Sequence, residues 1–258
     1  MNRLVPLTIA LFLSVACFGQ TVETVSERFH YVYLKQEIPP TQEQIQRDNE
    51  ERQRNWQEEL EQMKAGLVSD NVKVELRTDV QDNNLTVSVA YETLVMTEAA
   101  DDYGLGKYAI ENSNACMLMC NFLKEKMEND LADLLKQGAR VEFKITGATD
   151  GTPIRSRIDY RGEYGDFTDK PITLNGSPYM MTVTRNTGIT TNSQLAFLRT
   201  QGVEHFLKTQ VQPLKHTQNT FEEFAVENKE KGGGYRRVSV EITLYNAFIV
   251  EPQNTVEP

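Results

Sequence analysis

Hydrophobic and polar residues alternate along several stretches of this chain, most clearly over residues 141–150. The sequence there is V-E-F-K-I-T-G-A-T-D, with hydrophobic side chains at Val141, Phe143 and Ile145. A period of two residues predicts a half-buried β-strand, which we expect to stop at Gly147. Asp150 then falls on the loop at the carboxyl end of the strand. Ligands commonly bind at that edge of an α/β sheet.

The same alternation predicts further strands. Residues 72–76 and 85–91 alternate on either side of the turn-forming Asp82-Asn83-Asn84, which indicates a hairpin. Residues 221–226 resemble a strand, and residues 238–244 form a final strand in which every second residue is hydrophobic. Residues 20–40 contain several aromatic residues and are a weaker candidate for an added strand.

A long polar helix is predicted over residues 41–67. Thr41 and Gln44 have the spacing of a capping box, and the interior is rich in Glu, Gln and Arg. Its hydrophobic residues are sparse and mostly follow residue 55. We therefore expect the last three turns, from Trp56 on, to dock on a domain or partner, and the first three turns to be solvated. This pattern favours a spacer over an extended coiled coil.

A second helix is expected to start near Ser113 or Asn114 and to end at Gly138. Its Met and Leu residues form a drifting hydrophobic stripe that is most simply core packing. Cys116 and Cys120 are four residues apart on this helix. That spacing could suit a metal, but no His or further Cys lies nearby in sequence, which favours small buried core residues.

A third helix is predicted over residues 192–207, and one of its residues breaks the amphipathic pattern. Arg199 lies near the middle of the hydrophobic arc. The arc consists of Leu195, Leu198, Gly202, Val203, Phe206 and Leu207. A buried guanidinium needs a fixed partner, because an unpaired buried charge costs several kcal/mol. Asp150 is the obvious carboxylate, and a purely structural Arg–Asp bridge is as good an interpretation as a binding site.

Three elements of the chain resemble the OmpA-like domain, the C-terminal, peptidoglycan-binding domain of outer-membrane protein A. G-A-T-D, residues 147–150, resembles its G-x-T-D element. N-S-Q-L-A-F-L-R-T-Q-G-V-E-H-F-L, residues 192–207, resembles its N-x-x-L-S-x-x-R-A-x-x-V-x-x-Y-L helix, and Y-R-R-V-S-V-E-I, residues 235–242, resembles its closing N-R-R-V-x-I strand. Each element is weak alone, but the three occur in the family's order. The resemblance covers roughly residues 85–248.

The resemblance implies an α+β fold, a two-layer βαβαββ sandwich with a mixed sheet, here preceded by a helical spacer and a strand. It also implies non-covalent binding of the diaminopimelate in the peptidoglycan stem peptide. Asp150 would accept the ligand ammonium and Arg199 would clamp a carboxylate. Asn192 would add an amide hydrogen bond and cap the helix near the anion, with Thr149 beside them. Arg237 is the motif-matched arginine, expected to be structural rather than ligand-contacting.

The chain departs from the family pattern in three places. Forty-one residues separate Asp150 from Asn192, where the family usually has a short loop. This insert, about residues 151–190, contains aromatic residues and an Asn175-Gly176 hairpin signal, so we expect a small β element beside the site. It could supply aromatic surfaces for glycan or cover the pocket. Ala196 and Tyr235 replace the family's usual Ser and Asn. The aromatic residues of the insert are Tyr160, Tyr164, Phe167 and Tyr179.

Composition and the first residues indicate an exported protein. The 258 residues carry a formal net charge of -10, which argues against binding nucleic acid or anionic lipid. Residues 1–19 read as a signal peptide, with Cys17 as an alternative lipid anchor. Residues 20–70 would form an N-terminal extension, 71–250 the OmpA-like domain, and 251–258 a flexible tail. We expect the mature chain in the periplasm, without a transmembrane segment, and association with the outer membrane is an alternative location.

No motif of a known catalytic site is present, so we expect no enzyme activity, cofactor or metal. The sequence lacks H-E-x-x-H, a G-x-S-x-G elbow, a P-loop and a dinucleotide fingerprint. The histidines are His30, His205 and His216, and His205 is expected at the boundary of its helix. An alternative function is a periplasmic scaffold that kept the fold and lost the ligand. In that case the insert and the 41–67 helix would bind protein partners.

Overall fold

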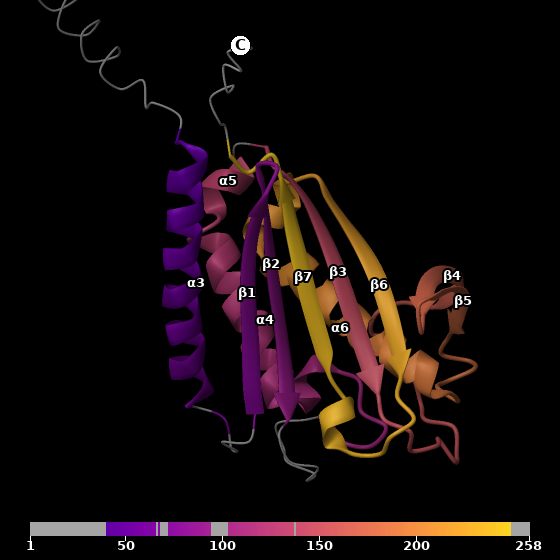
Figure 1. Cartoon of the computed structure of the whole chain (residues 1–258). Helices are drawn as coiled ribbons and strands as arrows, with labels where there is room; N and C mark the ends of the chain where they lie inside the picture. Colours follow the sequence, from indigo (N-terminus) through magenta and orange to yellow (C-terminus); the bar gives the residue numbers. More distant parts are fainter. Residues whose placement is uncertain (1–39, 66, 68–71, 94–102, 137, 249–258) are drawn as a thin grey trace, which may run out of the picture. The chain divides into compact units, whose positions relative to one another are not determined.

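The structure is a computed structural model that describes residues 40–65, 67, 72–93, 103–136 and 138–248 (Figure 1). The predicted signal sequence with Cys17, the candidate strand over residues 20–40 except for Pro40, His30, and the expected tail at 251–258 lie outside the described residues. From Thr41 on, the described residues belong to one compact unit. The long polar helix is therefore part of the same unit as the sheet.

A seven-stranded mixed sheet forms the centre of this unit, as the predicted α+β class requires. The strand order is β1-β2-β7-β3-β6-β4-β5 (Figure 1). β6 pairs in parallel with both β3 and β4, and the other neighbours are antiparallel. The strands are β1 Val72–Gln81, β2 Asn84–Thr93, β3 Arg140–Thr149, β4 Phe167–Leu174, β5 Ser177–Val183, β6 Asn219–Glu227 and β7 Val238–Tyr245.

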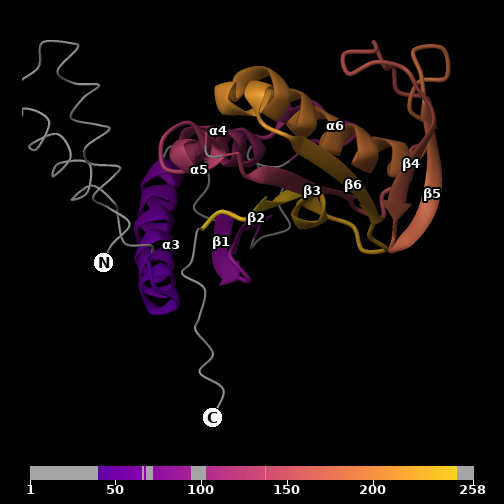
Figure 2. The same cartoon turned by 90° about the horizontal axis from the view of Figure 1, so that it is seen from above.

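Two main helices, α4 (Asn114–Glu128) and α6 (Asn192–Gln210), lie on one face of the sheet (Figure 2). The expected order of strand, helix, strand, helix, strand, strand is present as β2, α4, β3, α6, β6, β7. The prediction of one helix running to Gly138 is wrong. α4 ends at Glu128, and a short α5 (Ala132–Lys136) follows. The backbone leaves the helical path at Asn129, which has φ -111° and ψ -76°.

The predicted helix over residues 41–67 is α3 (Gln42–Lys64), and the capping box at Thr41 is formed as expected. The expectation that its first turns are solvated is wrong, because Ile45 and Asn49 are each only 3% exposed. The helix lies along β1 at the edge of the sheet (Figure 1). It therefore covers an edge strand over its whole length rather than acting as a free spacer.

Amide side chains spaced four residues apart on α3 satisfy the outward-facing backbone of β1. Gln57 Nε2 donates to the Val74 carbonyl at 3.5 Å, and Asn49 Nδ2 donates to the Thr78 carbonyl at 3.4 Å. Gln53 Oε1 accepts from the Thr78 backbone N–H at 3.3 Å. An uncovered edge strand would present these groups to other chains. The polar side chains of α3 thus provide hydrogen-bond partners for the backbone of the edge strand β1.

Both predicted hairpins are confirmed. Asp82 and Asn83 join β1 to β2 with positive φ of 48° and 66°, and Asn175 and Gly176 join β4 to β5 with φ of 49° and 81°. Two consecutive residues with positive φ match the twist of the flanking strands. The insert hairpin does not form a separate element, because β4 pairs with β6 and extends the main sheet.

The hydrophobic core has two parts, one on each side of α6. The larger part lies between the sheet and α4 and includes Phe122, Phe143 and Ile242. The second lies between α6 and the insert, where Phe167 packs edge-on against Phe197 with ring centroids 4.9 Å apart. Because the insert covers its second side, α6 is buried well beyond the hydrophobic arc that its sequence predicts.

Gly147 fixes the distance between α6 and β3. A Cβ atom at this position would lie 2.1 Å from the carbonyl oxygen of Ala196 on α6. Only glycine therefore permits this approach of helix to strand. The expectation that the strand stops at Gly147 is wrong. The strand β3 continues to Thr149, so Asp150 follows it directly.

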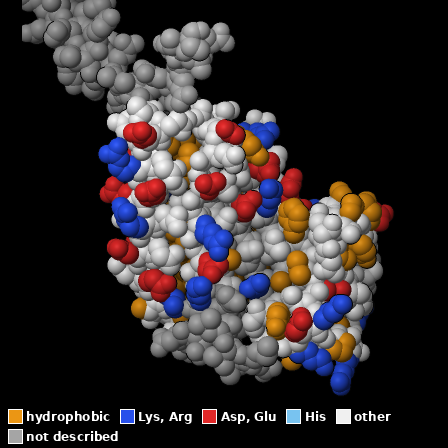
Figure 3. Space-filling view, in the orientation of Figure 1, with side chains coloured by type: hydrophobic (Ala, Val, Ile, Leu, Met, Phe, Trp, Pro, Cys, Tyr) orange, Lys and Arg blue, Asp and Glu red, His pale blue; other side chains and the backbone are white. Residues whose placement is uncertain are grey.

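The face of the sheet opposite to α4 and α6 is not covered by any helix of the described residues. Acidic and basic side chains are interspersed over β1, β2 and β7 on this face (Figure 3). They form ion pairs such as Lys144–Glu241 at 3.3 Å and Lys73–Glu75 at 2.7 Å. Among the described helices, none combines the length and the hydrophobicity that a membrane span needs.

Candidate functional site

A pocket of about 540 Å³ lies where β3 ends and α6 begins. Its walls come from four segments: the β2–α4 connection, the loop after β3, the first turns of α6, and the β6–β7 connection. Asp150, Asn192 and Arg199 all line it. The structure thus brings together three of the five residues that the sequence singled out.

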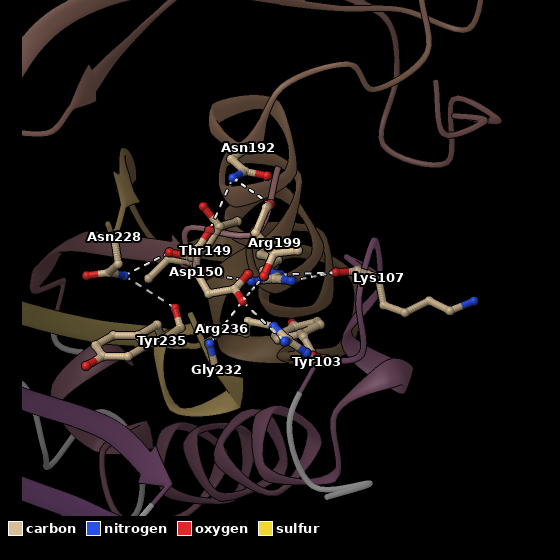
Figure 4. Close-up of polar contacts among 12 residues, drawn as sticks. Tyr103, Lys107, Thr149, Asp150, Asn192, Arg199, Asn228, Gly232, Tyr235 and Arg236 are labelled. Atoms are coloured by element: carbon tan, nitrogen blue, oxygen red, sulfur yellow. Dashed lines mark hydrogen bonds and ion pairs between the residues drawn. The ribbon is translucent and has the colours of Figure 1, made fainter. Parts of the chain in front are cut away.

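Asp150 is held at one of its two carboxylate oxygens. Oδ2 accepts hydrogen bonds from Thr152 Oγ1 at 2.7 Å, from the Gly232 backbone N–H at 3.1 Å and from Arg236 Nη2 at 3.2 Å (Figure 4). Oδ1 accepts no hydrogen bond from the described residues. Burial raises the pKa of Asp150, but the bonds from Thr152, Gly232 and Arg236 outweigh it and hold the pKa below its ordinary value. Asp150 is therefore an anion with one oxygen uncommitted.

Arg199 is fully buried, as the helical pattern predicts, but the predicted ion pair with Asp150 is not formed. Its guanidinium donates from Nε and Nη2 to the Lys107 carbonyl, at 3.1 and 2.9 Å, and from Nη1 to the Ala148 carbonyl (Figure 4). The guanidinium also lies over the ring of Tyr103, 4.4 Å from its centroid. Burial lowers the pKa of Arg199 to about 10, so it stays charged at neutral pH.

Asn192 does not cap α6, contrary to expectation. The N-cap is Thr191, which forms a capping box with Gln194. Asn192 Nδ2 instead donates to the carbonyls of Asp150 and Thr152, each at 3.1 Å (Figure 4). Asn192 therefore ties the loop that carries Asp150 to the start of the helix.

Thr149 is buried away from the pocket lining, at the end of β3. Its carbonyl accepts hydrogen bonds from the backbone N–H and the side-chain Nδ2 of Asn228, both at 2.9 Å (Figure 4). Its hydroxyl donates to the Val226 carbonyl at 3.5 Å. Thr149 thus joins β3 to β6 rather than lining the site.

The arginine of the closing motif that reaches the site is Arg236, not Arg237. Arg236 is 5% exposed, pairs with Asp150 and donates from Nη1 to the Tyr103 carbonyl at 3.3 Å. Arg237 is exposed, and its charge acts on Glu75 of β1. Arg236 lies two residues before β7 begins. If the strand alternation is extended back by these two residues, Arg236 falls on the same side as the inward-facing Val238, and the sequence shows this spacing.

The insert forms one wall of the pocket and leaves its rim exposed. Residues 152–156 and Ile158 line the pocket, and Arg155 and Ser156 are exposed. The aromatic side chains of the insert mostly pack inward rather than forming a glycan-binding surface. Tyr160 is buried, Tyr164 and Phe167 are half-buried, and Tyr179 is 45% exposed on β5.

The remaining candidates from the sequence lie elsewhere. Cys116 and Cys120 are buried in the core, as expected, and the Tyr103 hydroxyl donates to Cys116 Sγ at 3.1 Å. His205 is exposed on α6 beside Tyr164, with ring centroids 5.8 Å apart. Within the part of the chain that the structure describes, no group of His, Cys, Asp or Glu side chains has the arrangement of a metal site.

Comparisons with known proteins include a similarity to a solved structure. No protein-family model matches the chain, and no curated protein matches it. Among solved structures, the chain is similar to the OmpA-like domain of FopA1 from Francisella tularensis subsp. tularensis SCHU S4. The sequences are 12% identical, the TM-score is 0.27, and the similarity covers 69% of this chain and 83% of that chain.

Proposed function

We propose that this protein binds peptidoglycan non-covalently through the diaminopimelate of the stem peptide, and so ties an envelope component to the cell wall. The observation that carries the proposal is the placement of Asp150 and Arg199, 49 positions apart in sequence, in the lining of one pocket. Diaminopimelate carries an ammonium and a carboxylate on one carbon. A fixed anion beside a fixed cation suits such a zwitterion.

In this proposal the ligand ammonium binds Asp150 Oδ1, the oxygen that accepts no bond from the described residues. The opposite oxygen is fixed by three donors, so the carboxylate is already oriented before a ligand arrives. Binding then requires little ordering of this side chain, which favours affinity. Asn192 keeps the Asp150 loop against α6 in the same way.

The ligand carboxylate lies against Arg199. A guanidinium has five N–H donors, and three donate to the carbonyls of Lys107 and Ala148. The others have no partner among the described residues. Because Arg199 is 0% exposed, the Tyr103–Lys107 side of the pocket has to move for direct contact with a ligand. The Lys107 carbonyl is the acceptor that a ligand carboxylate would replace.

Retention on purified sacculi tests the proposal. We expect the full chain to be retained by sacculi whose third stem residue is diaminopimelate and lost from sacculi with lysine there, since lysine lacks the second carboxylate. Asp150→Asn should abolish retention, whereas the matched control Asp159→Asn, on an exposed insert residue, should not. Circular dichroism would check that both variants are folded at the temperature of the assay. Equal retention on both kinds of sacculi would refute the proposal without any variant.

A scaffold without a ligand is the second candidate, and one observation favours it. Asp150 already has Arg236 as a counter-charge, and Arg199 is satisfied in part by backbone carbonyls. A scaffold predicts no retention on any sacculi by the wild type. The proposed function also implies export to the periplasm. N-terminal sequencing of the protein from cell fractions would test cleavage after residue 19.

A further inference from the structure

The pocket has more positive charge than a single zwitterion needs. Its lining includes Arg155, Arg199, Lys231 and Arg236, and its one acidic residue is Asp150. Lys107 also lines the pocket, but its side chain points away from the Asp150 cluster (Figure 4). This excess is local, because the whole chain has a formal net charge of -10. A cationic pocket in an acidic protein concentrates anionic ligands.

Two of these cations have no counter-charge. Arg236 is neutralised by Asp150, but the side chains of Arg155 and Lys231 make no ion pair or hydrogen bond with the described residues. They come from separate segments, the insert and the β6–β7 connection, and both are exposed at the rim. Like charges that converge on one opening repel each other unless an anion lies between them.

A buried donor in the same wall also lacks an acceptor. Arg236 is 5% exposed, and its Nε has no hydrogen-bond partner. It is the one buried side-chain nitrogen or oxygen in the described residues with this property. A buried donor without an acceptor is costly, and native structures rarely keep one without a reason. The start of α6, where Asn192 lines the pocket, adds the positive end of a 19-residue helix.

We propose that Arg155, Lys231 and Arg236 form a second anion subsite beside the Asp150–Arg199 position, and that it takes a further carboxylate of the same ligand. The inference rests on the proposed function and narrows its ligand class. In a stem peptide, glutamate is linked through its γ-carboxyl, so its α-carboxylate is free unless it is amidated. The pocket therefore selects acidic stem peptides over those whose glutamate carboxylate is amidated.

Calorimetric titration of the full chain with two synthetic tripeptides tests this inference. One is Ala-γ-Glu-diaminopimelate, and the other is the same peptide with the glutamate α-carboxylate amidated. We expect amidation to weaken binding by at least about 10-fold, the loss of one charge-assisted hydrogen-bonded contact. The difference should shrink as salt rises, since rim charges are screened.

Arg155→Gln/Lys231→Gln is the variant that assigns the effect to the subsite. This variant should bind the acidic peptide about 10-fold more weakly than the wild type does. It should bind the amidated peptide with the same affinity as the wild type does. Arg161→Gln/Lys229→Gln is the matched control, with the same change of charge on exposed residues outside the pocket lining. The control should retain the wild-type preference.

The other outcomes of these titrations distinguish failure of the second subsite from failure of the proposed function. If the wild type binds both peptides equally and Asp150→Asn abolishes both, the second subsite is refuted and the proposed function stands. If neither peptide binds, the proposed function fails and the subsite fails with it. Inorganic phosphate is the probe for a free anion. Binding of phosphate that depends on Arg155 and Lys231, without binding of either peptide, would overturn the stem-peptide assignment.

Discussion

Replacing Asp150 by Asn tests whether the ion pair with Arg236 holds the site together. Asn keeps an oxygen that can accept from Thr152, Gly232 and Arg236, so the shape of the loop is preserved and only the charge is lost. In the ion pair the side chain of Asp150 is 7% exposed and that of Arg236 is 6% exposed. The variant therefore leaves a buried guanidinium without its counter-charge.

The expected cost follows from this burial. Removing one partner of a buried ion pair costs about 3–5 kcal/mol, because the other charge remains desolvated. For a domain of this size, about 1 kcal/mol corresponds to roughly 2–4 °C in Tm, so we expect Tm to fall by roughly 10 °C. Asp166→Asn is the control. Asp166 also accepts from a backbone N–H and a guanidinium, both of Arg185, but the pair is exposed, so Tm should not change.

Thermal unfolding followed by circular dichroism at several pH values would measure both effects. The folded-state pKa of Asp150 lies below the unfolded value, so its contribution is complete above the unfolded pKa of about 3.9. It is lost as pH falls through the lower, folded-state value. The difference in Tm between wild type and Asp150→Asn should therefore vanish in strong acid. A loss at pH 7 no greater than that of Asp166→Asn would refute the assignment of Arg236 as the partner.

Three further variants test packing and electrostatics at separate places in the fold. Gly147→Ala should cost about 3 kcal/mol in urea unfolding, because its Cβ would lie 2.1 Å from a carbonyl of α6, whereas Gly104→Ala should be neutral. Gln53→Ala should cost about 1–2 kcal/mol and speed hydrogen exchange at the Thr78 amide, and unchanged exchange would contradict the edge contact. Burial and the neighbouring Glu204 raise the pKa of Glu223, so wild-type stability should decline as pH rises from the unfolded value through the folded one. Glu223→Gln should flatten that decline, and parallel pH curves would contradict it.

Local sequence patterns could have predicted which of the two arginines, Arg236 or Arg237, contacts Asp150. Matching the motif R-R-V leaves two adjacent arginines equally good, and the sequence interpretation took the second. The alternation in β7 distinguishes them, because Val238 and Val240 face the core and Arg236 shares their parity. Adjacent residues of a strand face opposite sides of the sheet. Extending the alternation of β7 two residues back beyond its first residue would have selected Arg236.

The partner of Arg199 was not predictable in this way. Helical periodicity correctly placed the guanidinium among buried residues, and burial implied that it must be paired. Its acceptors are the main-chain carbonyls of Lys107 and Ala148. Every residue has a carbonyl, so this kind of partner leaves no mark in the sequence. The sequence made Asp150 the obvious carboxylate partner, and the structure pairs Asp150 with Arg236 instead.

The insert both lines the pocket and packs against α6. Its hairpin was visible in Asn175-Gly176, but its pairing with β6 was not, because a strand's partner is a long-range property. That pairing places Phe167 against Phe197, so α6 is held from the sheet side and from the insert side. The segment that supplies Arg155 is thus continuous with the element that fixes the helix carrying Arg199. The insert therefore stabilises the position of the helix that carries Arg199, and it also contributes Arg155, which has no ion-pair partner among the described residues, to the rim of the pocket.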